Sequence, residues 1–386
     1  MKLSDICKYR NEKINLKDIN ENEYVSTDNM LPNFAGLGEL KSFPNVDRVN
    51  KFCRNDILLS NIRPYFKKMI LSDNNSGCSS DVLVIETINK DVNPKFLYYR
   101  LRLDDFFDYV ILTSKGTKMP RGDKKAIMNF ELEVPKLDIQ NKIVKIIENI
   151  DKKIELNNKI NNNLYEMLKD IYKELYLNNS SYKNWKSMTL DDVTSKFATG
   201  LNPRKNFVLG QGNNYYVTIK NMQNNQVVLD SKCDRVDDEA LVKINKRSDL
   251  KVGDLLFSGI GTIGRTYLIK NKPTNWNVSE SVFTIRPNNK ISSEFLYLLL
   301  LDSDMQNYAV SKASGSVQKG IRMADLKLYK LNVPEKEWME AFTNTVRPLI
   351  DKIYLNYEMN DKLCKLRDAL LPKLMNDEID LDNIEI

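Results

Sequence analysis

Phe96-Leu97-Tyr98 and Phe295-Leu296-Tyr297 are two copies of one stretch, placed about 199 residues apart in the chain. The likeness extends over both halves of the sequence. It includes Asp56-Ile57-Leu58-Leu59-Ser60 with Asp254-Leu255-Leu256-Phe257-Ser258, Tyr24-Val25 with Tyr216-Val217, and Leu132, Val134 and Pro135 with Leu331, Val333 and Pro334. A repeat of this length is typical of a duplicated domain. Two similar halves mimic a symmetric dimer and suit a ligand with two related ends.

Composition narrows the class of protein. The chain has 386 residues, 42% hydrophobic content and a formal net charge of +6, enough for more than one core and mildly favourable for a polyanionic partner. No apolar run is long enough for a membrane span, and the first residues lack an apolar signal core. We therefore expect a cytoplasmic protein without membrane association.

The residue types that are missing exclude several chemistries. The sequence contains no histidine, so a Ser-His-Asp triad, a Cys-His pair and an HExxH zinc site are all excluded. Its five cysteines are scattered and form no CxxC pair, which favours reduced thiols over a disulfide framework or a metal site. We predict no catalytic residue, no cofactor site and no metal site in this chain.

Each half divides into a globule and a long helix. We predict α+β globules over residues 1–135 and 179–334, long helices over 136–178 and 335–376, and a C-terminal tail over 377–386. The globules read as strands bounded by turns, and one amphipathic helix is expected near the end of each, over Pro94 to Asp108 and Ser292 to Val310. The two globules are expected to be related by pseudo-twofold symmetry.

The long helices carry a heptad seam. Apolar residues are spaced four and three apart from Ile143 to Leu175, and the second half repeats the pattern from Phe342 to Leu374. A strict seam this long needs another helix as its partner, so we predict an antiparallel coiled-coil pair that separates the globules. Arg367 interrupts the second seam, where Leu366 is expected to substitute, and Pro348 should kink or restart that helix.

Asparagines replace apolar residues in the middle of both seams. An asparagine buried at such a position costs stability but fixes the register of a helix pair. We therefore interpret these residues as a polar layer that sets the distance between the globules; the alternative is that they face solvent in an Asn-rich stretch. The residues are Asn157, Asn161, Asn356 and Asn360.

Gly259-Ile260-Gly261-Thr262-Ile263-Gly264 matches the GxGxxG pattern of dinucleotide-binding proteins. That function requires a helix next, whose N-terminus holds a pyrophosphate. Here Arg265-Thr266-Tyr267-Leu268-Ile269 follows, which reads as a strand. The pattern therefore predicts a hairpin, and a nucleotide-binding oxidoreductase is disfavoured.

A basic loop recurs before the Val-Pro marker of each half, over Thr113–Gly122 and Lys312–Arg322. Glycine allows close backbone approach, and hydroxyl, basic and amide side chains can bind phosphates or base edges; a solvated surface loop would look the same. These loops, the hairpins around Arg63 and Lys67 and around Arg265, and Lys220 give our candidate DNA-binding residues. They are Arg63, Lys67, Lys115, Thr117, Lys118, Arg121, Lys220, Arg265, Ser316, Gln318, Lys319 and Arg322.

The order of these motifs, met twice, resembles the specificity subunit of type I restriction-modification systems. The hairpin around Asp254-Leu255-Leu256 looks like the family's "GDIL-S" hairpin, Gly315-Ser316-Val317-Gln318-Lys319-Gly320-Ile321 looks like its "GS-QKGI" loop, and Val134-Pro135 followed by the Asn-rich helix looks like its repeat region. The second helix departs from the pattern because Glu335-Lys336-Glu337-Trp338-Met339 lacks the usual Leu and Gln.

The resemblance implies a non-catalytic subunit. Two target-recognition domains would each read half of a bipartite double-stranded DNA site with a fixed gap, and the long helices would dock two methyltransferase subunits. S-adenosylmethionine would be bound by those partners, and restriction/translocase subunits could join them. Two alternatives are the recognition subunit of a different methylation system and a coiled-coil scaffold without a nucleic-acid role. The scaffold predicts no salt-dependent DNA binding.

Overall fold

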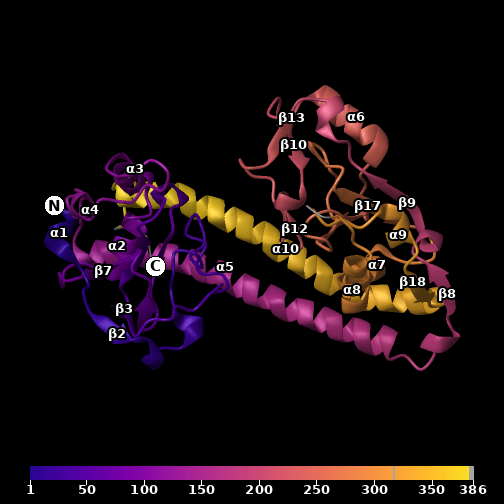
Figure 1. Cartoon of the computed structure of the whole chain (residues 1–386), viewed down its shortest axis with the longest axis horizontal. Coiled ribbons are helices and arrows are strands. Elements are labelled where there is room, and N and C mark those ends of the chain that lie inside the picture. The colour runs from indigo at the N-terminus through magenta and orange to yellow at the C-terminus, as the bar shows by residue number, and fades with distance from the viewer. Residues whose placement is uncertain (316–317, 382–386) are drawn as a thin grey trace. The chain divides into compact units, whose positions relative to one another are not determined.

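The computed structural model describes residues 1–315 and 318–381. The chain forms two compact units (Figure 1). The first consists of Met1–Glu155 with Met359–Ile386, and the second of Leu156–Glu358. Each unit therefore contains one globule and a segment of each long helix. In the described part of the chain, no helix is both long and apolar enough to cross a membrane.

The two globules share a four-stranded antiparallel sheet. Its order is β1-β7-β4-β5 in the first unit and β9-β17-β14-β15 in the second. Figure 1 labels several of these strands. The bounds are Cys7–Tyr9 (β1), Ile57–Ser60 (β4), Met69–Leu71 (β5) and Val82–Thr87 (β7), then Thr194–Thr199 (β9), Leu255–Ser258 (β14), Thr266–Leu268 (β15) and Val282–Pro287 (β17). The strands expected around Ile57, Val82 and Val282 are confirmed.

The globules differ in their second sheet. The first has the antiparallel order β2-β3-β6, whereas in the second β10 pairs antiparallel with β13 and parallel with β16. The second also has a helix, α6 (Asp238–Ser248), against β16, where the first has β3 (Arg48–Phe52) against β6. The other bounds are Lys13–Asn15 (β2), Ser76–Cys78 (β6), Asn214–Val217 (β10), Asp234–Val236 (β13) and Trp276–Val278 (β16).

The single helix expected near the end of each globule is wrong, because two helices form in each place. The first globule has α2 (Pro94–Arg100) and α3 (Asp104–Leu112), and the second has α7 (Ser293–Leu301) and α8 (Ser303–Ser311). Leu103 and Asp302 are extended at the breaks, and the Asp302 carboxylate accepts a hydrogen bond from the backbone N–H of Asp304. An N-cap of this kind starts a new helix, which the apolar period alone does not reveal.

The remaining α-helices and strands are short and, with several 3-10 turns, join these parts. They are the helices α1 (Leu3–Ile6), α4 (Lys124–Met128) and α9 (Met323–Lys327), and the strands β8 (Lys186–Thr189), β11 (Met222–Gln223), β12 (Gln226–Val227) and β18 (Lys330–Val333). β18 pairs antiparallel with β8, so the end of the second globule is tied to its beginning.

The long helices are α5 (Leu137–Tyr172) and α10 (Lys336–Met375), and both contribute to each unit. Their segments run antiparallel within each unit. In the first, Ile143 and Ile147 share a core with Leu371 and Leu374, and Asp151 bonds Arg367. In the second, Tyr172 lies against Phe342, and Asn161 bonds Asn356. α10 continues through Pro348 without interruption, so the expected restart does not occur. At the end of α5 a π-turn over Lys173–Leu177 shifts the buried face by one residue, which leaves the predicted seam residue Leu175 exposed and buries Tyr176 instead.

Candidate nucleic-acid interface

The structure joins the glycine-rich hairpin and the recurring loop of the second globule into one surface. Gly259–Gly264 connects the antiparallel strands β14 and β15, so the hairpin prediction is confirmed. The Gly261 N–H donates to the carbonyl of Lys319 (2.8 Å), and the Ile321 N–H donates to the carbonyl of Gly259 (2.8 Å). The hairpin and the loop therefore hold each other through main-chain bonds, which leaves their side chains available.

The first globule makes the same connection from different residues. The Arg63 N–H donates to the carbonyl of Pro120 (2.8 Å), the Gly122 N–H donates to the carbonyl of Asn61 (3.2 Å), and Ile62 and Arg121 form an isolated bridge. The equivalent bridge in the second globule links Ile260 to Gly320. One backbone frame therefore presents two different sets of side chains.

The hairpins achieve their turns differently. Gly264 has φ +95, and a Cβ added there would lie 1.8 Å from Oε1 of Gln306. The Gln306 side chain donates to the carbonyls of Gly264 (2.9 Å) and Leu300 (2.5 Å), so it is held in place. In the first globule Lys67 (φ 49) stands at the position of Gly264, and Arg63 (φ 51, ψ 64) at that of Gly261. The left-handed conformation is costly for both, because each has a Cβ.

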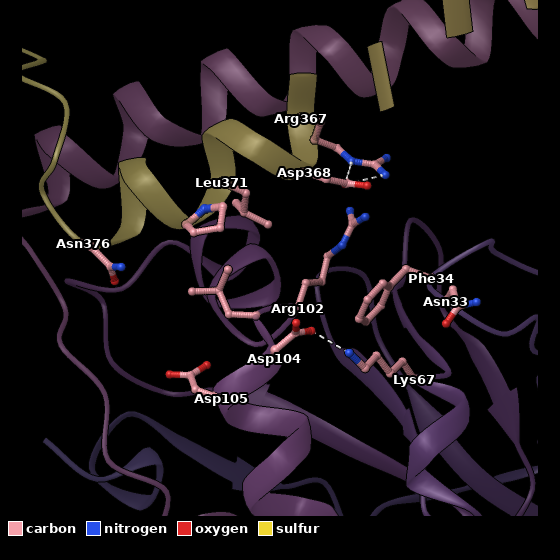
Figure 2. A pocket seen from close by; sticks show the side chains of 12 residues that line it. Asn33, Phe34, Lys67, Arg102, Asp104, Asp105, Arg367, Asp368, Leu371 and Asn376 are labelled. Carbon is pink, nitrogen blue, oxygen red and sulfur yellow. Dashed lines mark hydrogen bonds and ion pairs between the residues drawn. The ribbon is translucent and has the colours of Figure 1, made fainter. Parts of the chain in front are cut away.

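The basic side chains on the hairpin and loop of the first globule differ in whether an acidic residue pairs with them. Lys67 is paired with Asp104, Lys115 with Asp123 and Arg121 with Asp81. Arg63 and Lys118 are exposed and form no ion pair within the described residues, and Thr117 is exposed beside them. Figure 2 shows Lys67 pointing to Asp104. The unpaired cations are the better placed to meet an external anion.

The second surface places Gln318, Lys319 and Arg322 on the exposed loop. Lys220 is exposed on a neighbouring turn, Ile219–Asn221. Ser316, also predicted as a contact, lies outside the described residues.

Arg265 has a structural contact that the sequence did not reveal. Its Nη1 donates to the carbonyls of Ile219 and Met222, each at 2.7 Å, and the residue is half-buried. Arg265 therefore attaches the Lys220 turn to the hairpin. In the first globule Lys68 has the corresponding role, because its Nζ donates to the carbonyl of Thr27 (2.6 Å).

Comparison with known proteins identifies the family. The family model "Type I restriction modification DNA specificity domain" matches residues 1–166 and 182–363. The chain belongs to this family. As a specificity subunit it is the DNA-recognition component of a type I restriction-modification system, and it is not the catalyst.

Individual relatives of this specificity subunit are distant but cover nearly all of it. The HindI specificity subunit of Haemophilus influenzae is 22% identical over 92% of this chain and 94% of its own, and the MjaVIII specificity subunit of Methanocaldococcus jannaschii is 24% identical over 86% and 80%. The crystal structure of a type I S subunit from M. genitalium covers 97% of this chain and 95% of its own at 15% identity, with a TM-score of 0.59. That structural likeness supports the fold.

Sequence reasoning missed one feature of the candidate surface on the first globule. Tyr65 and Phe66 follow Arg63 in the turn, remain 47% and 37% exposed, and have ring centroids 4.7 Å apart. Exposed aromatic rings beside basic residues suit contact with sugars and bases. The sequence signal was an aromatic pair in a turn with basic residues on both sides. Analysis by apolar periodicity alone assigns such a pair to the core.

The long helices of the specificity subunit contain the predicted polar layer. Asn157, Asn161 and Asn356 are at most 3% exposed, and Asn360 is half-buried. Asn356 Nδ2 donates to Asn161 Oδ1 (2.7 Å), and Asn161 Nδ2 donates to the carbonyl of Ile353 (3.3 Å). The solvent-facing alternative is therefore wrong for the three buried asparagines.

The expected substitution of Leu366 for Arg367 is also wrong. Leu366 is 48% exposed, whereas Arg367 points into the seam and donates to Asp151 Oδ1 (2.9 Å). Burial lowers the pKa of Arg367, but its hydrogen bond to Asp151 and the charge of that carboxylate raise the pKa above its ordinary value. Arg367 is therefore charged within a buried network.

Proposed function

We propose that this specificity subunit reads a bipartite double-stranded DNA site, with one half-site bound by each globule. The observation that supports the proposal is the main-chain frame of hairpin and loop, which occurs once in each globule and carries different side chains. The first loop has Pro120-Arg121 where the second has Lys319-Gly320. One frame with two sets of side chains suits the reading of two different half-sites.

We further propose that α5 and α10 fix the gap between the half-sites and dock two methyltransferase subunits. The buried Asn161–Asn356 hydrogen bond supports a fixed register, because shifting the helices by one residue would leave both amides without partners in an apolar seam. S-adenosylmethionine would be bound by the methyltransferases. Restriction/translocase subunits would act through the same complex.

Methylation mapping tests the bipartite site. The chain is co-expressed with its methyltransferase partner, and modified adenines are located by single-molecule sequencing. We expect a motif of two parts with a constant gap. Exchange of residues 1–135 for those of a relative should change one part of the motif only. A change in both parts, or an uninterrupted motif, would contradict one reader per globule.

Single variants separate phosphate contacts from base contacts. Lys319→Ala and Lys118→Ala remove exposed loop cations from the second and first globules, respectively. A phosphate contact predicts weaker binding to all sequences and a salt slope lower by about 1, whereas a base contact predicts lost discrimination at one half-site of about 1–3 kcal/mol. Lys330→Ala, an exposed lysine on β18 and outside the loops, is the matched control.

Salt dependence distinguishes this function from a scaffold. Phosphate neutralisation releases counterions, so the affinity for DNA should fall steeply between 50 and 200 mM salt, by about 10³-fold or more for six or more phosphate contacts. The affinity is measured for the complex with its methyltransferase. An intact complex without salt-dependent DNA binding would favour the scaffold.

A further inference from the structure

One carboxylate, Asp151, lies at the centre of a polar cluster in the first unit. It accepts hydrogen bonds from the Tyr99 hydroxyl (2.9 Å) and from Arg367 (2.9 Å), and Nη1 of Arg102 lies 3.7 Å away. The side chains of Arg102 and Arg367 are only 7% and 17% exposed. The cluster thus joins the globule, α5 and the C-terminal segment of α10 through two largely buried guanidinium groups and a partly exposed carboxylate.

The surroundings of Arg102 show that this charge is retained at a cost. Its guanidinium lies 4.8 Å from the ring centroid of Phe34, yet its Nε is buried without a hydrogen-bond partner within the described structure. Figure 2 shows Arg102 pointing from the globule toward Arg367 on α10, beside a cavity of about 630 Å³. Apolar residues in place of a buried ionic cluster are often no less stable, so the charges need another explanation.

The second unit has apolar residues at all four equivalent positions. The offset of the repeat relates Tyr99, Arg102, Asp151 and Arg367 to Leu298, Leu301, Ile350 and Leu168. Leu168, Leu298 and Ile350 are buried in one core cluster, and Leu301 packs against it. Each globule therefore meets the opposite helix with a matched set, polar in the first unit and apolar in the second.

Mismatched sets would be unfavourable in both directions. The α5 segment around Leu168, placed against the first globule, would cost the partly exposed Asp151 its hydrogen bond from Arg367 and leave it the Tyr99 hydroxyl and the more distant Arg102 as partners. The α10 segment around Arg367, placed against Leu298 and Ile350, would bury a guanidinium without an anion. An unpaired buried charge is strongly destabilising, although replacing a whole buried ionic cluster by apolar residues often is not.

We propose that these four residues, Tyr99, Arg102, Asp151 and Arg367, form a pairing code. Through it the first globule selects a helix with a cation at the seam and rejects a helix with leucine there. The competitor it excludes is the α5 segment of a second copy of this chain, which is the repeat equivalent of the correct α10 segment. Specificity then comes from the penalty on wrong pairs rather than from extra stability of the right pair. This inference does not depend on which DNA sequence the globules read.

A double-mutant cycle in the full chain tests the code. Its variants are Arg367→Leu, the triple variant Tyr99→Leu, Arg102→Leu and Asp151→Ile, and the combination of all four. Hydrogen exchange of peptides from the first unit reports local opening. We expect at least about tenfold faster opening in each mismatched variant and near wild-type protection in the combined, fully apolar chain. Additive effects would overturn the proposal.

Transplanting the code gives a second test that does not rely on the triple variant folding. Leu168→Arg should lower the urea midpoint of the second unit, which is followed by tryptophan fluorescence because Trp185, Trp276 and Trp338 all lie in that unit. Adding Leu298→Tyr, Leu301→Arg and Ile350→Asp should restore at least half of the loss. Arg367→Lys, which keeps the cation, is the conservative control for the cycle in the first unit. No rescue would overturn a portable code.

Association between copies tests the excluded partner. The wild-type and four-substitution chains, each with two different tags, are mixed over a range of concentrations, and co-purification and sedimentation are measured. We expect the apolar chain to form mixed-tag assemblies at lower concentration than the wild type. Equal association of both chains would mean that the cluster stabilises the first unit without choosing its partner.

Discussion

The two globules place a buried carboxylate directly before equivalent strands, Asp56 before β4 and Asp254 before β14, but neutralise it from different places. Asp56 is bound by Arg10, which follows β1, and Asp254 by Arg286 within β17, each through two hydrogen bonds. The hydrogen bond to Asp56 raises the pKa of Arg10, and that to Asp254 raises the pKa of Arg286. The two halves thus share the carboxylate in the turn before the hairpin, whereas the arginine that pairs with it comes from a different strand region in each half.

The contacts between globule and helix show a reversal of the same kind. Lys95 on α2 pairs with Glu148 on α5, and the equivalent residues of the second unit are Glu294 and Arg347, which pair with opposite polarity. The position of the ion pair is therefore the same in both halves, but the acidic and basic residues are exchanged between globule and helix. A chain containing two copies of one fold needs such differences if each helix is to pack in its own place.

The largest effect is expected from removing either carboxylate. Asp56→Asn and Asp254→Asn remove the buried anion of a largely buried arginine and leave it only more exposed partners, Glu12 and Glu86 for Arg10 and Asp249 for Arg286. We therefore expect a loss of up to about 3 kcal/mol in the stability of the affected unit only. Tryptophan fluorescence in urea reports the second unit and hydrogen exchange the first. Glu12→Gln, at an exposed partner of Arg10, is the control and should cost little. Equal losses in both units from one variant would show that the units do not unfold separately.

Breaking the second hairpin should have the next largest effect. Gly264→Ala forces a positive φ on alanine and displaces Gln306 from its two carbonyls, so we expect a loss of about 1–3 kcal/mol. Gly210→Ala has a similar φ but open space around the added Cβ, and it should show the backbone strain alone. The difference between the two urea midpoints measures the Gln306 contact, and no difference would mean that this contact relaxes freely.

In the first hairpin a left-handed arginine, Arg63, occupies the position of Gly261, and its replacement should have the opposite effect on stability. Arg63→Gly relieves a left-handed arginine, so we expect a gain in stability of up to about 1 kcal/mol after the entropic cost of glycine. DNA affinity should fall because an exposed cation is lost. Arg63→Asn, which tolerates the same conformation without the charge, separates strain from charge. Affinity unchanged in both variants would remove Arg63 from the interface.

The smallest effect is expected from pH near neutrality. Histidine is the side chain that ordinarily titrates there, and the sequence has none, so the DNA affinity should be nearly constant from about pH 6 to 8 at fixed ionic strength. Fluorescence anisotropy with labelled DNA measures it. A pronounced change over this range would place a titrating partner group in the interface.

Strongly acidic pH, unlike pH near neutrality, should destabilise the basic loop Thr113–Gly122 of the first globule. The hydrogen bond from Lys115, together with backbone N–H groups, lowers the pKa of Asp123 from 3.8 to about 2. A lowered carboxylate pKa stabilises the folded loop above the unfolded value and loses that contribution as pH falls toward 2. Hydrogen exchange of residues 113–123 at decreasing pH should show this loss, and Lys115→Ala should move it to higher pH.

The sequence alone determined the duplication, the long helices and the hairpin identity of the glycine motif, because repeat offset, heptad period and the strand after Gly264 are local signals. It did not predict that Arg367 would occupy the seam or that Arg265 would hold a turn, since each depends on a carboxylate or carbonyl distant in sequence. Nor could it reveal the break before α8, where apolar residues continue the helical period but the Asp302 carboxylate caps a new helix. Tertiary structure decided these points because burying a charged side chain is costly unless it is paired, and the partner is set by the fold and not by the neighbouring sequence.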